Sequence, residues 1–242
     1  MASTLIWDIP TRLFHWLFAV GFLAAAAISL TVDGEGPLFA YHAIIGLALA
    51  ALLVLRLAWG LVGSRYARLG ELVFGPGRLV EYAKGVLVGG GKRYIGHNPG
   101  SAYAIVAMFA LLGALAVTGV MLGTGNEGVK EVHEFCAYAM LAVVAVHILG
   151  VIVHSARHRE NITASMIHGR KHAEPGDGIP SSHAIAGALL LLITGVWTLE
   201  LVRSYSPSTQ AVTIPLFGTS LQIGEAEHEG EHRRDREQED DD

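Results

Sequence analysis

The sequence is poor in charge and almost devoid of cysteine. Only 16% of its 242 residues are charged and 52% are hydrophobic, whereas soluble domains average about 25% charged residues. This deficit excludes an ordinary soluble domain. The single cysteine, Cys136, excludes an intrachain disulfide and a CxxCH motif for covalent haem attachment. We therefore expect Cys136 to be a packed apolar residue.

Acidic residues are also scarce where the apolar residues are concentrated. Crossing a bilayer requires about 20 apolar residues, and five blocks are long enough, with Glu134 and Glu200 near the ends of two of them. Backbone groups in lipid must be hydrogen-bonded internally, so each block is predicted to be a helix. The fold class is therefore predicted to be all-α and integral to a membrane. The blocks comprise residues 13–32, 39–62, 102–122, 132–153 and 182–202.

The residues before the first block are typical of a helix start and not of a signal peptide. They lack a basic n-region and a convincing small-residue cleavage site. Asp8-Ile-Pro-Thr predicts a capped helix with proline in its first turn. Trp7 and Trp16 are expected to be anchors at the membrane interface.

Basic residues are concentrated in two of the connections, which predicts the orientation of the chain. Cytoplasmic connections carry an excess of lysine and arginine, so both are expected to be cytoplasmic. The N-terminus is then cytoplasmic too, and five spans place the C-terminus on the opposite side. The basic residues are Arg65, Arg68, Arg78, Lys84, Lys92 and Arg93 in the second connection, and Arg157, Arg159, Arg170 and Lys171 after the fourth span.

Three segments outside the spans have their own character. Residues 76–88 are predicted to form an amphipathic helix at the interface. Residues 206–222 are mixed in composition and are expected to form short strands or a loop. Residues 225–242 are charged with almost no apolar content, so we interpret them as disordered.

Four histidines lie within the apolar blocks. An ionisable side chain in hydrocarbon is costly and usually has a function and a partner. His147 follows His133 by 14 residues in the fourth block, so both rings project from one stripe of a helix about 21 Å apart. The predicted orientation places His15 at the depth of His147 and His42 at the depth of His133.

Two level pairs of imidazoles predict two buried metal cofactors. A haem between facing helices of a bundle takes axial ligands from both sides, and two imidazoles leave no open position, which suits electron transfer. A polar contact between helices is the alternative for any single histidine. One four-histidine zinc site is excluded by the separation of about 21 Å. His154 is interpreted as an interfacial residue or a contact of a haem propionate, and His183 as an interfacial residue.

These residues resemble bacterial cytochrome b561-type proteins and the b-type cytochrome subunit of nickel–iron hydrogenases. The resemblance covers roughly residues 5–172 and depends on the order and spacing of several modest motifs. They are the stretch from Trp7 to Trp16, Tyr41-His42, Gly96-His-Asn-Pro-Gly-Ser-Ala102, Thr118-Gly119, and the series from His133-Glu-Phe-Cys through His147 to Met166-Ile-His-Gly-Arg-Lys171.

The resemblance implies a four-helix transmembrane bundle with two b haems. Mapped onto this chain, His15 and His147 would bind the iron of the inner haem, and His42 and His133 that of the outer haem. Arg12 would neutralise a haem propionate, unless it is an ordinary positively charged anchor. His97 and Asn98 occupy positions where the family keeps polar residues near the inner haem. The predicted domains are residues 1–172 for the dihaem bundle, 173–205 for a fifth helix, and 206–242 for an external acidic tail.

The implied function is electron transfer across the bacterial inner membrane, in a respiratory chain. Electrons would pass between the quinone pool and a c-type cytochrome, dehydrogenase or hydrogenase. The alternatives are a histidine-using transporter for protons or metal ions, and a passive membrane anchor subunit. Membrane lipid and quinone are expected partners, nucleic acid is not, and a second copy of the chain is left open. The acidic tail is either solvated or a docking patch for a basic partner.

Overall fold

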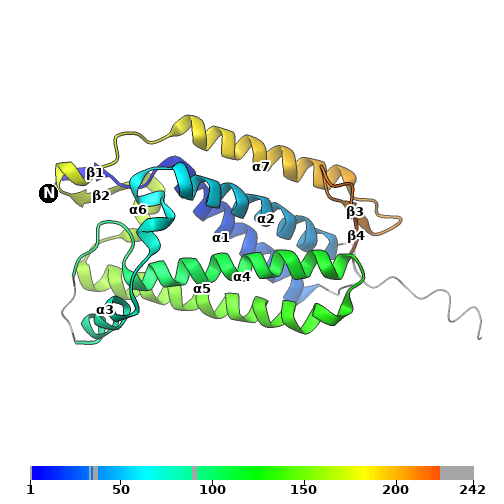
Figure 1. Ribbon diagram of the computed structural model, residues 1–242, viewed down its shortest axis with the longest axis horizontal. Helices are drawn as coiled ribbons and strands as arrows, with labels where there is room; N and C mark the ends of the chain where they lie inside the picture. Colours follow the sequence, from blue (N-terminus) through cyan, green and yellow to red (C-terminus); the bar gives the residue numbers. More distant parts are fainter. Residues whose placement is uncertain (1, 33, 35–37, 89–91, 224–242) are drawn as a thin grey trace, which may run out of the picture.

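The computed structural model describes residues 2–32, 34, 38–88 and 92–223, and five long helices form an elongated bundle within them (Figure 1). All five are long and apolar enough to cross a membrane, which confirms the five predicted spans and the all-α membrane class. The acidic tail beyond residue 223 lies outside the described residues. The long helices are α1 (Ile9–Thr31), α2 (Phe39–Val62), α4 (Pro99–Gly123), α5 (Lys130–His158) and α7 (Ala184–Ser204).

Short elements lie at the two ends of the bundle. The predicted interfacial helix is present as α3, with the expected bounds of Pro76–Val88. Among the described residues there are also four short 3-10 turns. The remaining elements are β1 (Ala2–Leu5), α6 (Ile162–His168), β2 (Arg170–Ala173), β3 (Ala211–Thr213) and β4 (Ser220–Gln222), with the turns η1 (Arg65–Ala67), η2 (Leu69–Leu72), η3 (Glu127–Val129) and η4 (Pro175–Asp177).

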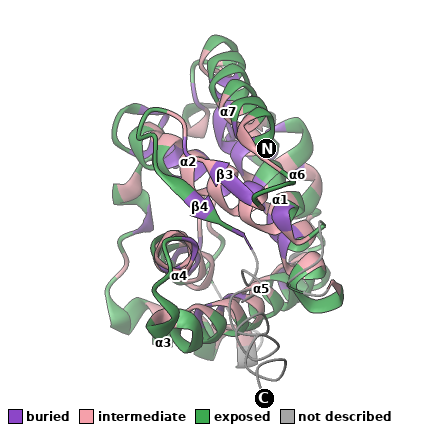
Figure 2. Cartoon of the chain, turned by 90° about the vertical axis from the view of Figure 1, so that its right-hand side faces the viewer, coloured by how far each residue is buried: buried purple, intermediate pink, exposed green. Residues whose placement is uncertain are grey.

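The long helices form two closely packed pairs. α1 packs along α2, α4 packs along α5, and the contact of α2 with α4 joins the pairs. α7 lies against α1 and α2, on the side of the bundle away from α5 (Figure 2). The backbone of α5 has no comparably close packing with α1 or α2 in the described part of the chain. Side chains of α5 therefore face α1 and α2 across a wider separation than the one between α4 and α2.

The core of the bundle is apolar and partly aromatic. Phe14, Phe18 and Phe22 follow one another at four-residue intervals on α1, and successive ring centroids lie 5.7 and 6.1 Å apart. They are buried together with Leu52 of α2 and Met140 of α5. Many other large apolar side chains are exposed. Lipid is as apolar as these side chains, so close packing and interhelical hydrogen bonds must hold the helices together.

A clasp between the N-terminus and a late segment covers one end of the bundle. β1 pairs antiparallel with β2, so Leu5 lies opposite Arg170; the sequence did not predict this pairing. Trp7 is only 5% exposed and its indole donates to Ser165 Oγ. The interpretation of Trp7 as an interface anchor is therefore wrong, because the clasp and α6 bury the ring. The predicted helix cap is confirmed: Asp8 accepts from the Thr11 amide at 2.8 Å.

A β-hairpin covers the opposite end. β3 and β4 are antiparallel and lie across the end of the bundle in Figure 2, which confirms the expectation of short strands or a loop in this segment. Val212 and Leu221 of the hairpin pack with Leu201 of α7 and Ile44 of α2. A Cβ atom at Gly123 would lie 2.9 Å from Leu221 Cβ. The hairpin is thus seated directly on the last turn of α4.

Two histidine pairs as the candidate functional site

His42 and His133 lie close together near the hairpin end of the bundle. They come from the first turns of α2 and α5, and their ring centroids are 6.4 Å apart, with the ring planes inclined at 70°. Both side chains are half-buried. The structure thus brings together the pair that the sequence predicted from depth.

The second ring nitrogen of each imidazole is held by the protein. His42 Nδ1 lies 2.9 Å from the Ala25 carbonyl oxygen, which can only accept, so Nδ1 carries the proton. His133 Nδ1 lies 2.8 Å from Thr118 Oγ1, whose own proton is directed to the Ala114 carbonyl at 2.7 Å. His133 Nδ1 is therefore also the donor. Both Nε2 atoms are left unprotonated, as a metal ligand requires.

This pair fits a bis-imidazole haem. Two imidazoles bound on opposite sides of one metal, each with a bond of about 2 Å, have ring centroids roughly 6 Å apart, which agrees with the observed 6.4 Å. Gly46 follows His42 by one helical turn and a Cβ atom there would meet nothing within 4 Å. The pair therefore has both the donor chemistry and adjacent open space that a flat cofactor needs.

His15 and His147 form the second pair, near the clasp end. His15 lies early in α1 and His147 late in α5, and the two rings are within electrostatic range of each other. Both are half-buried. His15 Nδ1 is buried without a hydrogen-bond partner, which distinguishes this pair from His42 and His133. One continuous helix, α5, thus provides one histidine to each pair.

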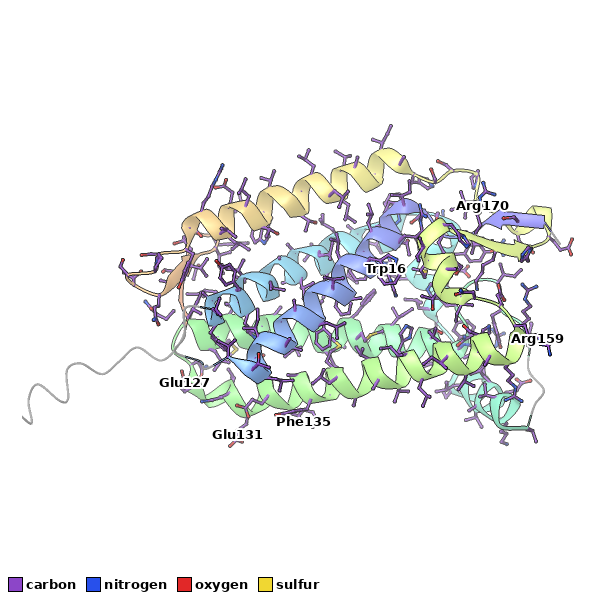
Figure 3. All side chains as sticks on the ribbon, turned by 180° about the vertical axis from the view of Figure 1, so that it is seen from behind. Trp16, Glu127, Glu131, Phe135, Arg159 and Arg170 are labelled. Carbon is purple, nitrogen blue, oxygen red and sulfur yellow. The ribbon has the colours of Figure 1, made fainter. Side chains whose placement is uncertain are left out.

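Arg12 is placed between α1 and α6. Its Nη1 donates to the Ile167 carbonyl, and the neighbouring Trp16 indole donates to the Met166 carbonyl at 3.1 Å; Figure 3 shows Trp16 beside this short helix. Both contacts satisfy carbonyls at the C-terminal end of α6. Arg12 Nε is buried without a partner, so its role at a haem propionate stays a prediction.

One buried arginine near the clasp end was not predicted from the sequence. Arg56 of α2 is 3% exposed, and its guanidinium carbon lies 5.8 Å from the ring centroid of Phe14 and 5.7 Å from that of Phe109. Its Nη1 is buried with no hydrogen-bond partner. The signal was available, because Arg56 stands inside the second apolar block and an intramembrane charge indicates function by default.

Asp8 is a second missed residue, fully buried at the clasp end. Besides capping α1, its carboxylate accepts from the indole nitrogen of Trp59 at 3.0 Å and from the hydroxyl of Ser64. Its oxygens thus join the start of α1 to the end of α2. Only its helix-capping role was visible in the sequence, because the other two donors are more than fifty residues away.

Positive charge is concentrated beside this network. The ring of His97 lies 4.8 Å from that of Trp7. Burial, followed by the charges of Arg56, Lys171 and His147, lowers the pKa of His97 to about 3 from its ordinary value of 6.5. Burial also lowers the pKa of Lys171, a shift that Glu160 opposes and Arg93 reinforces. The clasp end of the bundle therefore disfavours any additional positive charge.

Two further histidines considered from the sequence lie at the ends of long helices. His154 is buried near the end of α5, and His183 packs edge-on against Trp59 with centroids 5.2 Å apart. Across the described residues, no three His, Cys, Asp or Glu side chains come together in a way that could hold a metal ion. Cys136 is buried, as expected.

The five apolar helices and the paired imidazoles define a multi-pass membrane protein of the type represented by the membrane b-type cytochromes. The profile of one protein family, described as prokaryotic cytochrome b561, matches residues 6–169. The chain belongs to this prokaryotic cytochrome b561 family, which confirms the resemblance. The family implies haem b and electron transfer. The matched segment includes all four paired histidines and ends before β2 and α7.

Two curated relatives carry the same description, "Probable Ni/Fe-hydrogenase B-type cytochrome subunit". The protein from Rhizobium leguminosarum bv. viciae is 28% identical over 212 residues, which cover 70% of this chain and 89% of the relative. The protein from Bradyrhizobium diazoefficiens is 25% identical over 212 residues, covering 69% of this chain and 85% of the relative. No solved structure gives a significant match.

Proposed function

We propose that the protein is a dihaem cytochrome b that carries electrons across the membrane. His42 and His133 would bind one haem iron, and His15 and His147 the other. The observation that carries this proposal is the His42–His133 pair, with ring centroids 6.4 Å apart and both Nδ1 atoms held by protein oxygens. A bound haem would supply a centre that accepts and releases one electron at a time.

The residues around the His42–His133 pair would orient the two imidazole rings. The Ala25 carbonyl and Thr118 hold the His42 and His133 rings in one tautomer, which fixes the direction of each Nε2 lone pair. With two histidines holding each haem, no coordination position would be left for oxygen or substrate. This arrangement favours electron transfer over chemistry at the iron.

The proposed partners follow from the relatives. Because two relatives are described as probable hydrogenase subunits, we infer a nickel–iron hydrogenase or similar dehydrogenase on one side of the transfer and the quinone pool on the other. A c-type cytochrome is the alternative redox partner. From the basic connections we infer an N-terminus in the cytoplasm and a hairpin end of the bundle that faces the periplasm.

Replacement of one ligand in each pair tests the proposal. His42→Ala is expected to reduce the haem content from two per chain to one, and to leave the remaining haem with the spectrum and potential of the His15–His147 site. His15→Ala should give the opposite result. Haem content and optical redox titration of the purified protein are the measurements. His172→Ala, on an exposed position of β2, is the matched control and should retain both haems.

The outcomes separate the proposal from its alternatives. A colourless purified protein would support the transporter, and two intact haems in His42→Ala would disprove the assigned pairing. Rapid reduction of both haems by a quinol or by a hydrogenase with hydrogen would support electron transfer. Haems that neither donor reduces would indicate a passive anchor.

A further inference from the structure

The two histidine pairs differ in whether the buried nitrogen atoms in and around them have hydrogen-bond partners. At the hairpin end, both Nδ1 atoms have oxygen partners. At the clasp end, buried nitrogens of four side chains have none: Arg12 Nε, His15 Nδ1, His97 Nδ1 and Arg56 Nη1. Buried donors without acceptors are rare and costly in folded proteins. Arginine nitrogens can only donate, so at least Arg12 Nε and Arg56 Nη1 lack an acceptor at this end, whereas the hairpin-end pair does not.

Arg56 is held in place without being neutralised. Phe14 and Phe109 pack against its guanidinium group, and these contacts fix its position but supply no counter-charge. Its Nη1 would lie 3.3 Å from a Cβ atom at Gly60, so the glycine one turn further along α2 provides the space that the group occupies. A buried charge with no counterion is strongly destabilising.

The nearest influential carboxylate does not form an ion pair with Arg56. Asp8 does interact electrostatically with Arg56, but its hydrogen bonds go to Thr11, Trp59 and Ser64. The ion pairs described in the structure do not include Arg56. An anionic group with an acceptor oxygen that reached this interior position would therefore satisfy both the charge and the unpaired Nη1 of Arg56.

We propose that Arg56, together with His97, binds a carboxylate group of the haem held by His15 and His147. This inference rests on the proposed function. Arg56 packs over Phe14, in the same turn of α1 as His15, and His97 links the two parts of the site, because it is within electrostatic range of both Arg56 and His147. A haem b has two carboxylates on one edge, and a guanidinium group is the best-suited side chain for binding a carboxylate.

The arrangement gives Arg56 a second effect, on the reduction potential. A cation close to a haem disfavours its more positive, oxidised state, and the interaction is strong where burial lowers the local dielectric. Arg56 should therefore raise the potential of the clasp-end haem. The haem at His42 and His133 lies about four helical turns away along α5, so it should be affected much less.

Neutral and charge-preserving substitutions test the assignment in the full-length holoprotein. Arg56→Gln is expected to lower the midpoint potential of the His15–His147 haem and to speed its transfer to apomyoglobin by about tenfold, as the loss of a charge-assisted bond implies. Arg56→Lys should retain part of both properties. Arg203→Gln removes an exposed charge paired with Glu200 at the other end of α7 and should change neither.

A haem without carboxylates separates the proposed contact from a structural role. Apoprotein of wild type and of Arg56→Lys is reconstituted with haem or with its dimethyl ester, and retention is compared. If Arg56 binds the carboxylate, esterification should weaken wild-type retention about tenfold and abolish the difference between the two proteins. An equal difference with haem and with its ester would overturn the inference.

Failure of the inference is distinguishable from failure of the proposed function. A protein that binds no haem would refute the proposed function itself. A protein that binds two haems, whose potentials and retention do not respond to Arg56→Gln or Arg56→Lys, would retain the function and refute only the role of Arg56. Should Arg56→Gln not accumulate, Arg56→Lys and the ester comparison decide the question.

Discussion

At the scale of single residues, His42 and His133 each use one ring nitrogen for the protein and leave the other free. The four paired histidines could be predicted because polar side chains are conspicuous in apolar blocks. Their hydrogen-bond partners could not, since the Ala25 carbonyl and Thr118 reach the rings only through the relative register of neighbouring helices. Arg56 is also an ionisable residue inside an apolar block, so it could have been predicted in the same way as the histidines. It was overlooked because it stands next to the basic residues of the connection that follows α2.

Thr118→Val is expected to weaken the His42–His133 site without affecting the other pair. Valine has nearly the same shape but cannot accept the proton on His133 Nδ1, so the ring loses its fixed orientation. Loss of such a supporting contact typically lowers metal affinity by about 10- to 100-fold. Haem retention in each site is the measurement. Thr198→Val removes the same kind of hydroxyl-to-carbonyl bond on α7 and should have no effect; equal losses in both variants would contradict this role.

Tyr66 should make the protein sensitive to high pH. Burial raises the pKa of Tyr66 above its ordinary 10.0; Arg65 opposes the shift, whereas Asp177 and Glu71 add to it. The unfolded state therefore releases this proton at about pH 10 while the folded state keeps it, and stability decreases as the pH rises through that value. Between about pH 9 and about pH 11, the range of an ordinary tyrosine titration, the thermal stability of Tyr66→Phe should decrease less steeply than that of the wild type. An unchanged slope would show that other groups dominate.

At the scale of secondary-structure elements, the five spans and α3 could be predicted from hydropathy and amphipathic pattern, which are local properties. The β1–β2 clasp could not, because it joins segments more than 160 residues apart and each strand is too short to have a distinctive pattern. The location of Trp7 was predicted wrongly for this reason. Without the β1–β2 pairing its indole would be expected at the membrane interface, whereas with the pairing the indole is buried in the protein.

The contact of α7 with α1 depends on a glycine. A Cβ atom at Gly187 would overlap Ile9 Cγ2 and lie 3.2 Å from Ile9 Cβ, and both atoms are too close to the backbone to move freely. Gly187→Ala should therefore destabilise the protein by about 1–3 kcal/mol, as expected for overpacking. Gly195→Ala is the matched control, because a Cβ atom there meets nothing within 4 Å.

Thermal unfolding in detergent is the measurement for both glycine variants. Because α7 carries none of the four paired histidines, Gly187→Ala should keep its haem content at temperatures below unfolding. A variant as stable as Gly195→Ala would show that α7 does not depend on this close approach.

At the scale of the whole molecule, the long apolar helices form a bundle, as predicted. α7 packs on the outside of this bundle, and the hairpin covers one end. Figure 3 places Arg159 and Glu131 at opposite ends of α5, so the basic connection that follows α5 and the connection that precedes it lie at opposite ends of this helix. The pattern of charge predicted this separation. It could not predict that the hairpin would pack onto α4, because residues of mixed polarity gain their burial only from tertiary contacts.

The orientation in the membrane can be tested with the single cysteine removed. In a Cys136→Ala background, Glu127→Cys on η3 should react with a membrane-impermeant thiol reagent applied to the periplasmic side of intact cells. Arg78→Cys on α3 should react only after the inner membrane is opened, because the positive connections are predicted to be cytoplasmic. Both positions are exposed. The reverse pattern would invert the assigned topology.

α5 provides one histidine to each pair, so in the proposed dihaem protein this single continuous helix would set the spacing of the two haems. Mutations in α1 or α2 that tilt a haem without releasing it would leave the distance between His133 and His147 unchanged. The rate of electron transfer from one haem to the other should accordingly change little in such variants. Inserting one residue between His133 and His147 would turn one ring about 100° away from the other. One haem site would then lose its ligand, and electron transfer between the two sites would stop.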